Sequence, residues 1–534
     1  MICNNCHQEI GNANGLCPKC GAPIASPQQP VQQVAPPQPP QPKKSKKGLY
    51  ISLGVAAAVA VIAVAGWLFL RKSSDSSYLE KMIPATASAV VRVDAAQLAE
   101  KIGLEIDGMD IKLPKRVMDL TGANANDIQE FLGKIKESGI NPLGAIYGFS
   151  TNESLNAALL VPLFDQDKAK DFIEKEVGES FSKKDDSYFF SDGEAIVMLK
   201  NKALLVGFAN DNAKNSESLQ KLASDLMDGK QESIAKNSAI TSTLHNNKAI
   251  SLYADNEKIQ GLLNENPDYK KAMRDNPFAL LLSSISSTSM ALDVDDNQFT
   301  LTTDLGTKDK DYENFMGAIF HPASNDFLDY MPAGCNIMVA AGVNGKKIAS
   351  MEQIAFLLNN LPDELKTVIE SINGTIAAGG IFDSKNPETI PYTILIGSDK
   401  PDALLGIVKM FAFALGDVGV AGNYVYITTN QQVKKGDFSA PAECKDLFKN
   451  NWLGLYSSVG VSSFEFNTSW GFSSAKNTKF SFYINENGKK MKPIEWLVAF
   501  DEVQKQFKVF NNNTSNDFAF DEDADASGES NDDF

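Results

Sequence analysis

Four cysteines near the start of the chain are the residues whose spacing most clearly indicates chemistry. They form two Cys-x-x-Cys pairs, Cys3/Cys6 and Cys17/Cys20. A Cys-x-x-Cys turn lets two thiolates reach one ion, and two such turns close a tetrahedral Zn²⁺ site. Because all four ligands are thiolates, no coordination position is left for water or substrate, and we expect a structural zinc. Residues 1–22 are too few to bury a core, so the metal would supply the folding free energy.

This stretch resembles the zinc-ribbon family found at the N-terminus of bacterial membrane proteins. The resemblance covers residues 1–22 and rests on the four cysteines. Disulfides are the alternative for the same cysteines, and they would require an oxidising compartment. The segment has one basic residue, Lys19, and no aromatic side chain. A structural role or a protein partner therefore fits better than nucleic-acid binding.

The ribbon is followed by a linker and an apolar segment. Residues 23–47 are rich in Pro and Gln and then in Lys, a composition typical of an extended spacer. Gly48–Leu70 has no charged residue and, at about 1.5 Å per residue, is long enough to span a bilayer. A cleaved signal peptide is the alternative, but the preceding 47 residues do not fit it. We expect residues 48–70 to be a transmembrane helix.

The charges beside this segment predict its orientation. Four lysines precede it (Lys43, Lys44, Lys46 and Lys47), whereas only Arg71 and Lys72 follow. The excess of positive charge favours a cytoplasmic N-terminus, where thiols also stay reduced. We therefore expect a single-pass protein of the bacterial inner membrane, with the remaining chain extracytoplasmic.

The body of the chain is acidic and has enough apolar residues for a folded core. The net charge of the whole chain is −17, and 43% of its residues are hydrophobic. Residues 1–72 carry +6, so the rest carries −23. Such a body repels phosphate backbones, and we expect it to bind no nucleic acid. Cys335 and Cys444 could form a disulfide or remain buried thiols.

The body contains four pairs of similar segments in the same order, which predicts an internal duplication. Each copy combines β-hairpins with helices of three-four spacing, so we expect two related α+β lobes, at 77–320 and 321–510. Residues 511–534 are acidic and should be disordered. The matched pairs are Tyr78–Ala85 with Phe327–Ala333, Leu159–Lys168 with Tyr392–Pro401, Asn246–Tyr253 with Asn450–Tyr456, and Ser289–Thr303 with Ser469–Tyr483.

The openings of the two copies, Ile83–Ala85 and Met331–Ala333, each lead into an apolar strand. Together with the apolar segment before them, they resemble an uncharacterised family of bacterial envelope proteins of unknown function. This resemblance implies no active site.

Catalytic motifs are absent from the sequence. Ala340–Lys347 approaches a phosphate-binding loop, but Ala340 replaces its first glycine and Lys347 its hydroxyl residue. His245 and His321 lie beside polar or turn-like sequence with no cysteine or second histidine nearby, and they are more simply exposed or core side chains. We therefore predict no catalytic residue, and the only expected cofactor is the structural Zn²⁺ on Cys3, Cys6, Cys17 and Cys20.

These patterns favour a membrane-anchored binding or scaffold protein with an unidentified protein partner. Two alternatives stay open. The first is an envelope hydrolase, which would need two carboxylates about 5–9.5 Å apart in a cleft. The second is a transmembrane signalling protein, in which the ribbon recruits a cytosolic partner.

Overall fold

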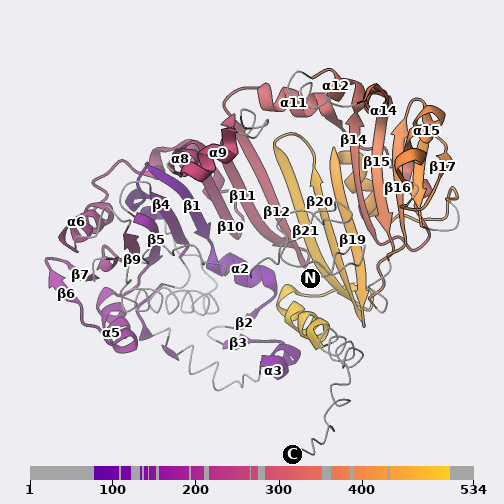
Figure 1. Cartoon of the computed structure of the whole chain (residues 1–534). Coiled ribbons are helices and arrows are strands. Elements are labelled where there is room, and N and C mark those ends of the chain that lie inside the picture. Colours follow the sequence, from indigo (N-terminus) through magenta and orange to yellow (C-terminus); the bar gives the residue numbers. More distant parts are fainter. Residues whose placement is uncertain are drawn as a thin grey trace, which may run out of the picture. The chain divides into compact units, whose positions relative to one another are not determined.

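The computed structural model describes the body of the chain as one antiparallel sheet with helices packed on it (Figure 1). A separate two-stranded sheet accompanies it. The described residues are 77–505, except 108–109, 122–132, 135–136, 142–143, 152–154, 192–193, 210–215, 265, 275–278, 280–282, 352–361, 385–389, 413 and 430–432.

The strands of the first half of the chain alternate with short turns and helices. They are β1 (Ala87–Val93), β2 (Glu105–Asp107), β3 (Asp110–Lys112), β4 (Ile146–Thr151), β5 (Leu155–Pro162), β6 (Ser182–Lys184), β7 (Ser187–Ser191), β8 (Ala195–Lys200), β9 (Ala203–Ala209), β10 (Ile250–Asp255), β11 (Ile285–Asp295) and β12 (Gln298–Thr307).

The strands of the second half begin with a short one. They are β13 (Phe320–His321), β14 (Ile337–Asn344), β15 (Ile372–Gly380), β16 (Tyr392–Ser398), β17 (Asp417–Ala421), β18 (Tyr424–Thr428), β19 (Leu453–Val461), β20 (Phe464–Phe472), β21 (Asn477–Glu486) and β22 (Lys489–Lys490).

The helices are short. The α-helices are α2 (Ala95–Ile102), α3 (Lys115–Thr121), α5 (Gln166–Val177), α6 (Ser216–Met227), α7 (Ser238–Leu244), α8 (Asn256–Leu263), α9 (Pro267–Arg274), α11 (Asp311–Ile319), α12 (Gly345–Ala349), α14 (Asp363–Ser371), α15 (Pro401–Ala412) and α16 (Ala442–Asn450). The 3₁₀ helices are η1 (Ser77–Met82), η2 (Ile234–Lys236), η3 (Asn325–Tyr330) and η4 (Pro493–Glu495), and residues 496–505 are helical.

The two halves have the same strand order. In the first half β1 lies between β4 and β10, and in the second half β14 lies between β15 and β19. One side of the first half continues as β5, β9 and β8, matching β16, β18 and β17 in the second. The other side continues as β11 and β12, matching β20 and β21.

The strand registers relate the halves residue by residue. In each half, a row of directly opposed residues crosses four strands, and the two rows are equivalent. The rows end at Asp304 of β12 and at Ser481 of β21. Thr302 and Lys479 each precede these end residues by two positions, so they are equivalent too. These two residues face each other where β12 pairs with β21. The rows are Val90, Tyr253, Ser289 and Asp304 in the first half and Met338, Tyr456, Ser469 and Ser481 in the second.

The predicted fold of two separate α+β lobes is therefore wrong. β12 and β21 pair antiparallel from Phe299 opposite Phe482 to Asp304 opposite Asn477, which joins both halves into one continuous sheet (Figure 1). We call this β12–β21 junction the seam. Each strand could be recognised from its own residues. The pairing of two hairpins that are distant in the sequence depends instead on which strand edges are left unpaired within each half.

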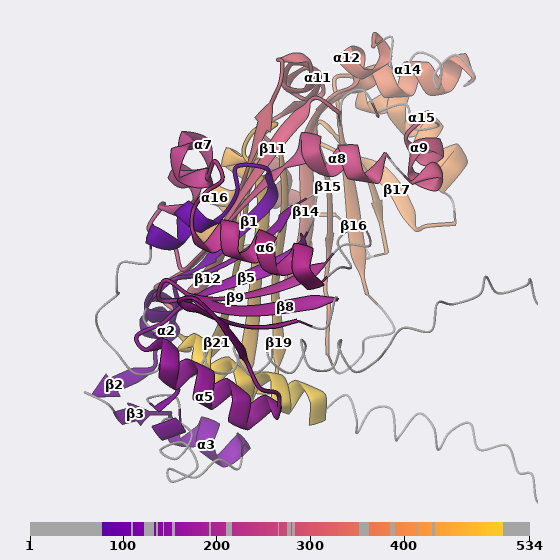
Figure 2. The same cartoon turned by 90° about the vertical axis from the view of Figure 1, so that its left-hand side faces the viewer.

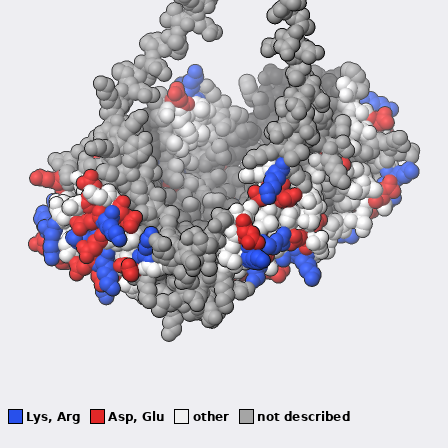
Figure 3. Space-filling model, turned by 90° about the horizontal axis from the view of Figure 1, so that it is seen from below, with Lys and Arg blue, Asp and Glu red and all other residues white. Residues whose placement is uncertain are grey.

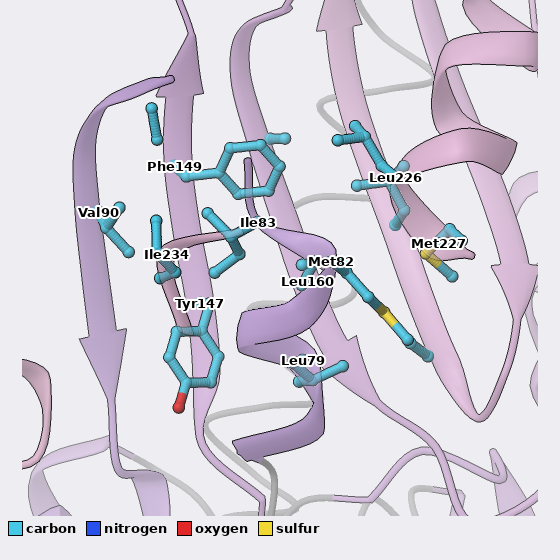
Figure 4. Close-up of a cluster of buried hydrophobic side chains, with 14 of the residues drawn as sticks. Leu79, Met82, Ile83, Val90, Tyr147, Phe149, Leu160, Leu226, Met227 and Ile234 are labelled. Carbon is cyan, nitrogen blue, oxygen red and sulfur yellow. The ribbon is translucent and has the colours of Figure 1, made fainter. Parts of the chain in front are cut away.

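Each half buries apolar side chains on both faces of its sheet. In the first half, Val90 and Tyr147 point to the face that η1 and α6 cover (Figure 4). On the opposite face, Val197 and Val206 pack against Ile173 of α5. Asp165 caps α5 by accepting hydrogen bonds from the amides of its first turn. Both faces are therefore covered, which explains the continuous burial of β8.

The second half repeats this arrangement with different residues. Phe327 of η3 and Phe448 of α16 meet edge to face, with ring centroids 5.0 Å apart, above β14 and β19. On the other face α15 covers β16 and β18. In Figure 2, α7 and α16 lie on the same side of the sheet, so equivalent helices cover equivalent faces.

The predicted ribbon (1–22), linker (23–47), transmembrane helix (48–70) and acidic tail (511–534) lie outside the described residues. Within the described ranges, no helix is both long and apolar enough to cross a bilayer. The same ranges contain no group of three His, Cys, Asp or Glu residues that could hold a metal ion. The fold described here is thus an antiparallel sheet with helices, and the predicted fold class is corrected to this.

A buried carboxylate ties α2 to the strands beside the seam. Asp293 of β11 is 3% exposed and forms ion pairs with Lys101 of α2 and Lys248, the latter at 2.7 Å. Burial would raise the pKa of Asp293, but the hydrogen bonds from both lysines hold it at about 2. The ionised form is therefore favoured in the folded protein.

We predict that Asp293→Asn lowers the free energy of unfolding by about 2–3 kcal/mol, because two lysines lose their common charged acceptor. The folded-state pKa lies below the ordinary value of about 4. The stabilisation is therefore present above about pH 4 and is lost as pH falls toward 2. Urea unfolding at pH 7 and pH 3 would measure both effects.

Asp295→Asn is the matched control, since Asp295 lies 3.6 Å from the same Lys101 but its side chain is 72% exposed. It should change the unfolding free energy by less than about 0.5 kcal/mol. Equal effects of the two substitutions would contradict this role of Asp293.

Candidate functional site

The seam carries a groove lined mostly by residues whose side chains have a polar group. Its cavity volume is about 390 Å³, within the usual range for ligand sites. The lining residues come from α7 and the turn after it, from β11, β12 and β21, and from the turn before β21. They are Thr243, Asn246, Ser289, Met290, Ala291, Thr302, Thr303, Asp304, Ser473, Asn477, Thr478 and Lys479. We call this site the seam groove.

The seam groove owes its polarity to the alternation of side chains along β12 and β21. Thr302 and Asp304 are exposed on the groove side, whereas Leu301, next to Thr302, is half-buried and does not line the groove. On β21, Lys479 likewise points into the groove and Phe480 away from it. Along these two strands Thr302, Asp304 and Lys479 therefore face the groove, whereas Leu301 and Phe480 do not line it.

Hydrogen bonds fix the wall of the groove on the α7 side. The hydroxyl groups of Thr243 and Ser289 lie 3.0 Å apart, which links α7 to β11. The Asn246 side-chain oxygen accepts from the Ser251 hydroxyl at 2.8 Å and from the Lys248 amide at 3.0 Å. This wall is therefore held in one arrangement by bonds within the protein.

A polar cluster of Glu80, Tyr147 and His245 lies under α7. His245 directly precedes Asn246, which lines the seam groove. Glu80 of η1 is 3% exposed, and one of its oxygens accepts a 2.7 Å hydrogen bond from the Tyr147 hydroxyl. His245 Nε2 lies 2.6 Å from the same oxygen. Burial and the charge of Glu80 raise the pKa of Tyr147, so the phenol stays protonated and donates to Glu80.

This cluster is best explained as a structural tie. Glu80 holds together η1, β4 and the C-cap of α7, through Tyr147 and His245. A His–Glu pair that activates a protein nucleophile would have that hydroxyl or thiol at the other ring nitrogen. Among the described residues, no hydroxyl or thiol hydrogen-bonds that nitrogen. His245, which the sequence left without an assigned role, therefore orders the helix beside the seam groove.

Among its described residues, the second half has no such cluster at the equivalent place. By register, Tyr147 corresponds to Ala377 and Arg92 to Ala340. The residue matching Glu80 is Asp329, whose side chain is 54% exposed. Sequence comparison of the two halves could have found this difference, since Glu80 and Asp329 are aligned in the matched openings.

The six cysteines were also candidates in the sequence analysis. Cys3, Cys6, Cys17 and Cys20 lie outside the described residues, so their assignment as zinc ligands stays a prediction. Cys335 and Cys444 are free thiols in one core cluster, and burial raises the pKa of each to about 12. Both are therefore unreactive core residues.

Two other candidates turn out to be parts of the scaffold. Both ring nitrogens of His321 lie near carbonyl oxygens, those of Pro322 at 2.9 Å and Val343 at 3.3 Å. Ala340–Lys347 is the end of β14 and the start of α12, where Asn344 caps the helix by accepting from the Lys347 amide. Neither segment contributes to the seam groove.

Charged side chains of both signs are interspersed on the described surface seen in Figure 3. The Lys and Arg residues that are described on that face form no separate patch. The expectation that the body binds no nucleic acid stays a prediction, as do a protein partner and the extracytoplasmic location.

Comparison with known proteins assigns the chain to a family. The family described as Domain of unknown function (DUF4836) matches residues 79–452, from η1 to the residue before β19. The chain belongs to this family. The identification as a zinc ribbon fused to a membrane-anchored envelope domain is corrected to membership of this family. Within the described residues of 77–505, no group of residues could hold a metal ion and no helix could span a bilayer.

No curated protein matches the chain significantly. Crystal form I of TP0453 matches with 14% identity and a TM-score of 0.26, covering 45% of this chain and 81% of that one. Crystal form III matches with 12% identity and the same TM-score, covering 48% and 91%. These low scores support no inference about the DUF4836 chain described here.

We predict that Tyr147→Phe lowers the free energy of unfolding by about 1–3 kcal/mol, because the buried carboxylate of Glu80 loses a donor. Tyr188→Phe is the matched control. Its hydroxyl also donates to a carboxylate at 2.7 Å, that of Asp167, but at an exposed position. It should cost less than about 0.5 kcal/mol. Urea unfolding of both variants measures the difference, and equal losses would contradict the proposed tie.

Proposed function

We propose that this protein is a binding protein whose seam groove takes a neutral, hydroxyl-rich ligand such as an oligosaccharide. The observation that carries the proposal is the lining of the groove. Ten of its twelve residues have side chains that donate or accept hydrogen bonds, and only Met290 and Ala291 do not.

The charge of the groove favours a neutral ligand. Asp304 and Lys479 are the only ionisable residues among the described lining, and their charges balance. A strongly charged ligand would therefore find no net attraction, and an apolar ligand would leave the hydroxyl and amide groups without partners. A sugar chain offers donors and acceptors in every direction, which matches the Thr, Ser and Asn side chains.

Binding fits this geometry better than hydrolysis does. A glycoside hydrolase needs two carboxylates across the scissile bond. Among the described lining residues, Asp304 supplies one carboxylate and no second one faces it. The signalling alternative depends on residues 1–22 and stays a prediction.

We predict that the purified protein binds at least one of maltohexaose, cellohexaose and chitohexaose, with one site per chain by isothermal titration calorimetry. Thr302→Tyr should weaken this binding tenfold or more, because the larger side chain fills the centre of the groove. Tyrosine is well tolerated in strands, so the sheet should be preserved.

Ser182→Tyr is the control, since it places the same side chain on an exposed position of β6, away from the seam. It should leave the dissociation constant unchanged. Absence of saturable binding by all three sugars at their highest soluble concentrations would contradict the proposal. So would equal binding by the wild type and the Thr302→Tyr protein.

A further inference from the structure

A second cavity lies in the second half, away from the seam. Its volume is about 460 Å³, and it is bounded by η3, the start of β15, the end of β16 and the turn between β17 and β18. We call it the η3 pocket. It is lined by Ser324, Asp326, Asp329, Tyr330, Asn373, Gly374, Thr375, Gly397, Gly422, Asn423, Tyr424 and Lys435.

Two tyrosines line the η3 pocket side by side, Tyr330 half-buried and Tyr424 6% exposed. The rings of Tyr330 and Tyr424 are tilted by 56°, with centroids 5.6 Å apart. Burial and the nearby charge of Asp326 raise the pKa of Tyr424 to about 12, so its ring remains a neutral phenol at physiological pH. A neutral aromatic face attracts a cation through its quadrupole.

Glycines keep the pocket open beside these tyrosines. A Cβ atom at Gly422 would lie 2.5 Å from the Tyr330 hydroxyl oxygen, and Gly422 also has a φ of +60°. A Cβ at Gly397 would lie 2.9 Å from the Thr375 carbonyl oxygen. Larger residues at either position would therefore displace the side chains or backbone that bound the cavity.

The charges of the pocket favour a cation. Lys435 lies 3.7 Å from Asp329, and both side chains are more than half exposed. Asp326 forms no ion pair with any described residue. The lining thus carries one net negative charge, that of Asp326, and this charge acts on Tyr424.

The first half shows that the fold does not require this pocket. By register, Gly397 corresponds to Pro162, and Tyr424 to Ala203. Gly422 corresponds to Asn201, which occupies the equivalent turn between β8 and β9. The aromatic ring and the glycines that open the cavity are therefore present in one copy only, on a scaffold that both copies share.

We propose that the η3 pocket binds the alkylammonium group of a small ligand, with the cation against Tyr330 and Tyr424 and beside Asp326. An ammonium group gains from the aromatic faces and from the unpaired carboxylate together. This site is independent of the seam groove, so either proposal can fail without the other.

The test uses choline and n-butylammonium as probes of a quaternary and a primary amine. Isothermal titration calorimetry should show one site per chain for at least one of them. The neutral isostere of choline, 3,3-dimethylbutan-1-ol, should bind at least tenfold more weakly, because it keeps the shape but lacks the charge. Equal binding by choline and the isostere, or no binding by either amine, would overturn the proposal.

Two variants assign the binding to this pocket. Asp326→Asn and Tyr330→Ala should each raise the dissociation constant of the amine tenfold or more. Asp402→Asn is the matched control, an exposed acid in the first turn of α15 outside the pocket. Circular dichroism would establish that each variant is folded. Unchanged affinity in folded Asp326→Asn and Tyr330→Ala would overturn the proposal.

Discussion

The pairing of β12 with β21 is the interaction on which the rest of this structure depends. Each half ends in a hairpin whose outer strand would otherwise present unpaired amide and carbonyl groups. Six consecutive residue pairs join these two edges, from Phe299 to Asp304 on β12. Since β12 and β21 are equivalent strands, each half meets the other through the same surface, as subunits do in a two-fold dimer.

The outer edges left by this arrangement are short, with lysines on β6 at one end. Pairing the long strands and leaving short ones at the edges reduces the risk of aggregation.

The two halves share strand order but have diverged where polar side chains gather. The first half buries Glu80 with Tyr147 and His245, at a layer where the second half has alanines. The second half opens a cavity around Tyr424, where the first half has Ala203. Core positions such as Val90 and Met338 keep their apolar character, because both faces of the shared scaffold must still be covered. Divergence is therefore concentrated at positions that the packing of the sheet does not determine, and these are the positions where ligand recognition can differ.

The sequence predicts local elements of this fold better than it predicts their assembly. The hairpins at Ser289–Thr303 and Ser469–Tyr483 could be recognised from alternating residues and polar turns, and they are β11–β12 and β20–β21. Their pairing across about 180 residues left no such signal, because strand alternation shows which side chain faces outward but not which edge it meets. The candidate sites were missed for the same reason. Thr302 and Lys479 are ordinary strand residues until the seam brings them together, and Tyr424 and Asp326 lie about a hundred residues apart.

The two faces of the seam have complementary roles. Opposite the groove, Phe482 and Phe299 pack edge to face on Trp496, with ring centroids 4.9 and 5.0 Å away. These contacts bury aromatic surface on one side of β12 and β21, which stabilises the pairing without occupying the groove side. The polar residues of the groove therefore lie on strands whose opposite face is packed. Because these residues are already ordered, ligand binding would cost little conformational entropy.

The η3 pocket is built instead from turns and strand ends. Its shape depends on Gly422 and Gly397 and on the cap of η3, so its ligand would be selected by a few specific contacts and not by an extended surface.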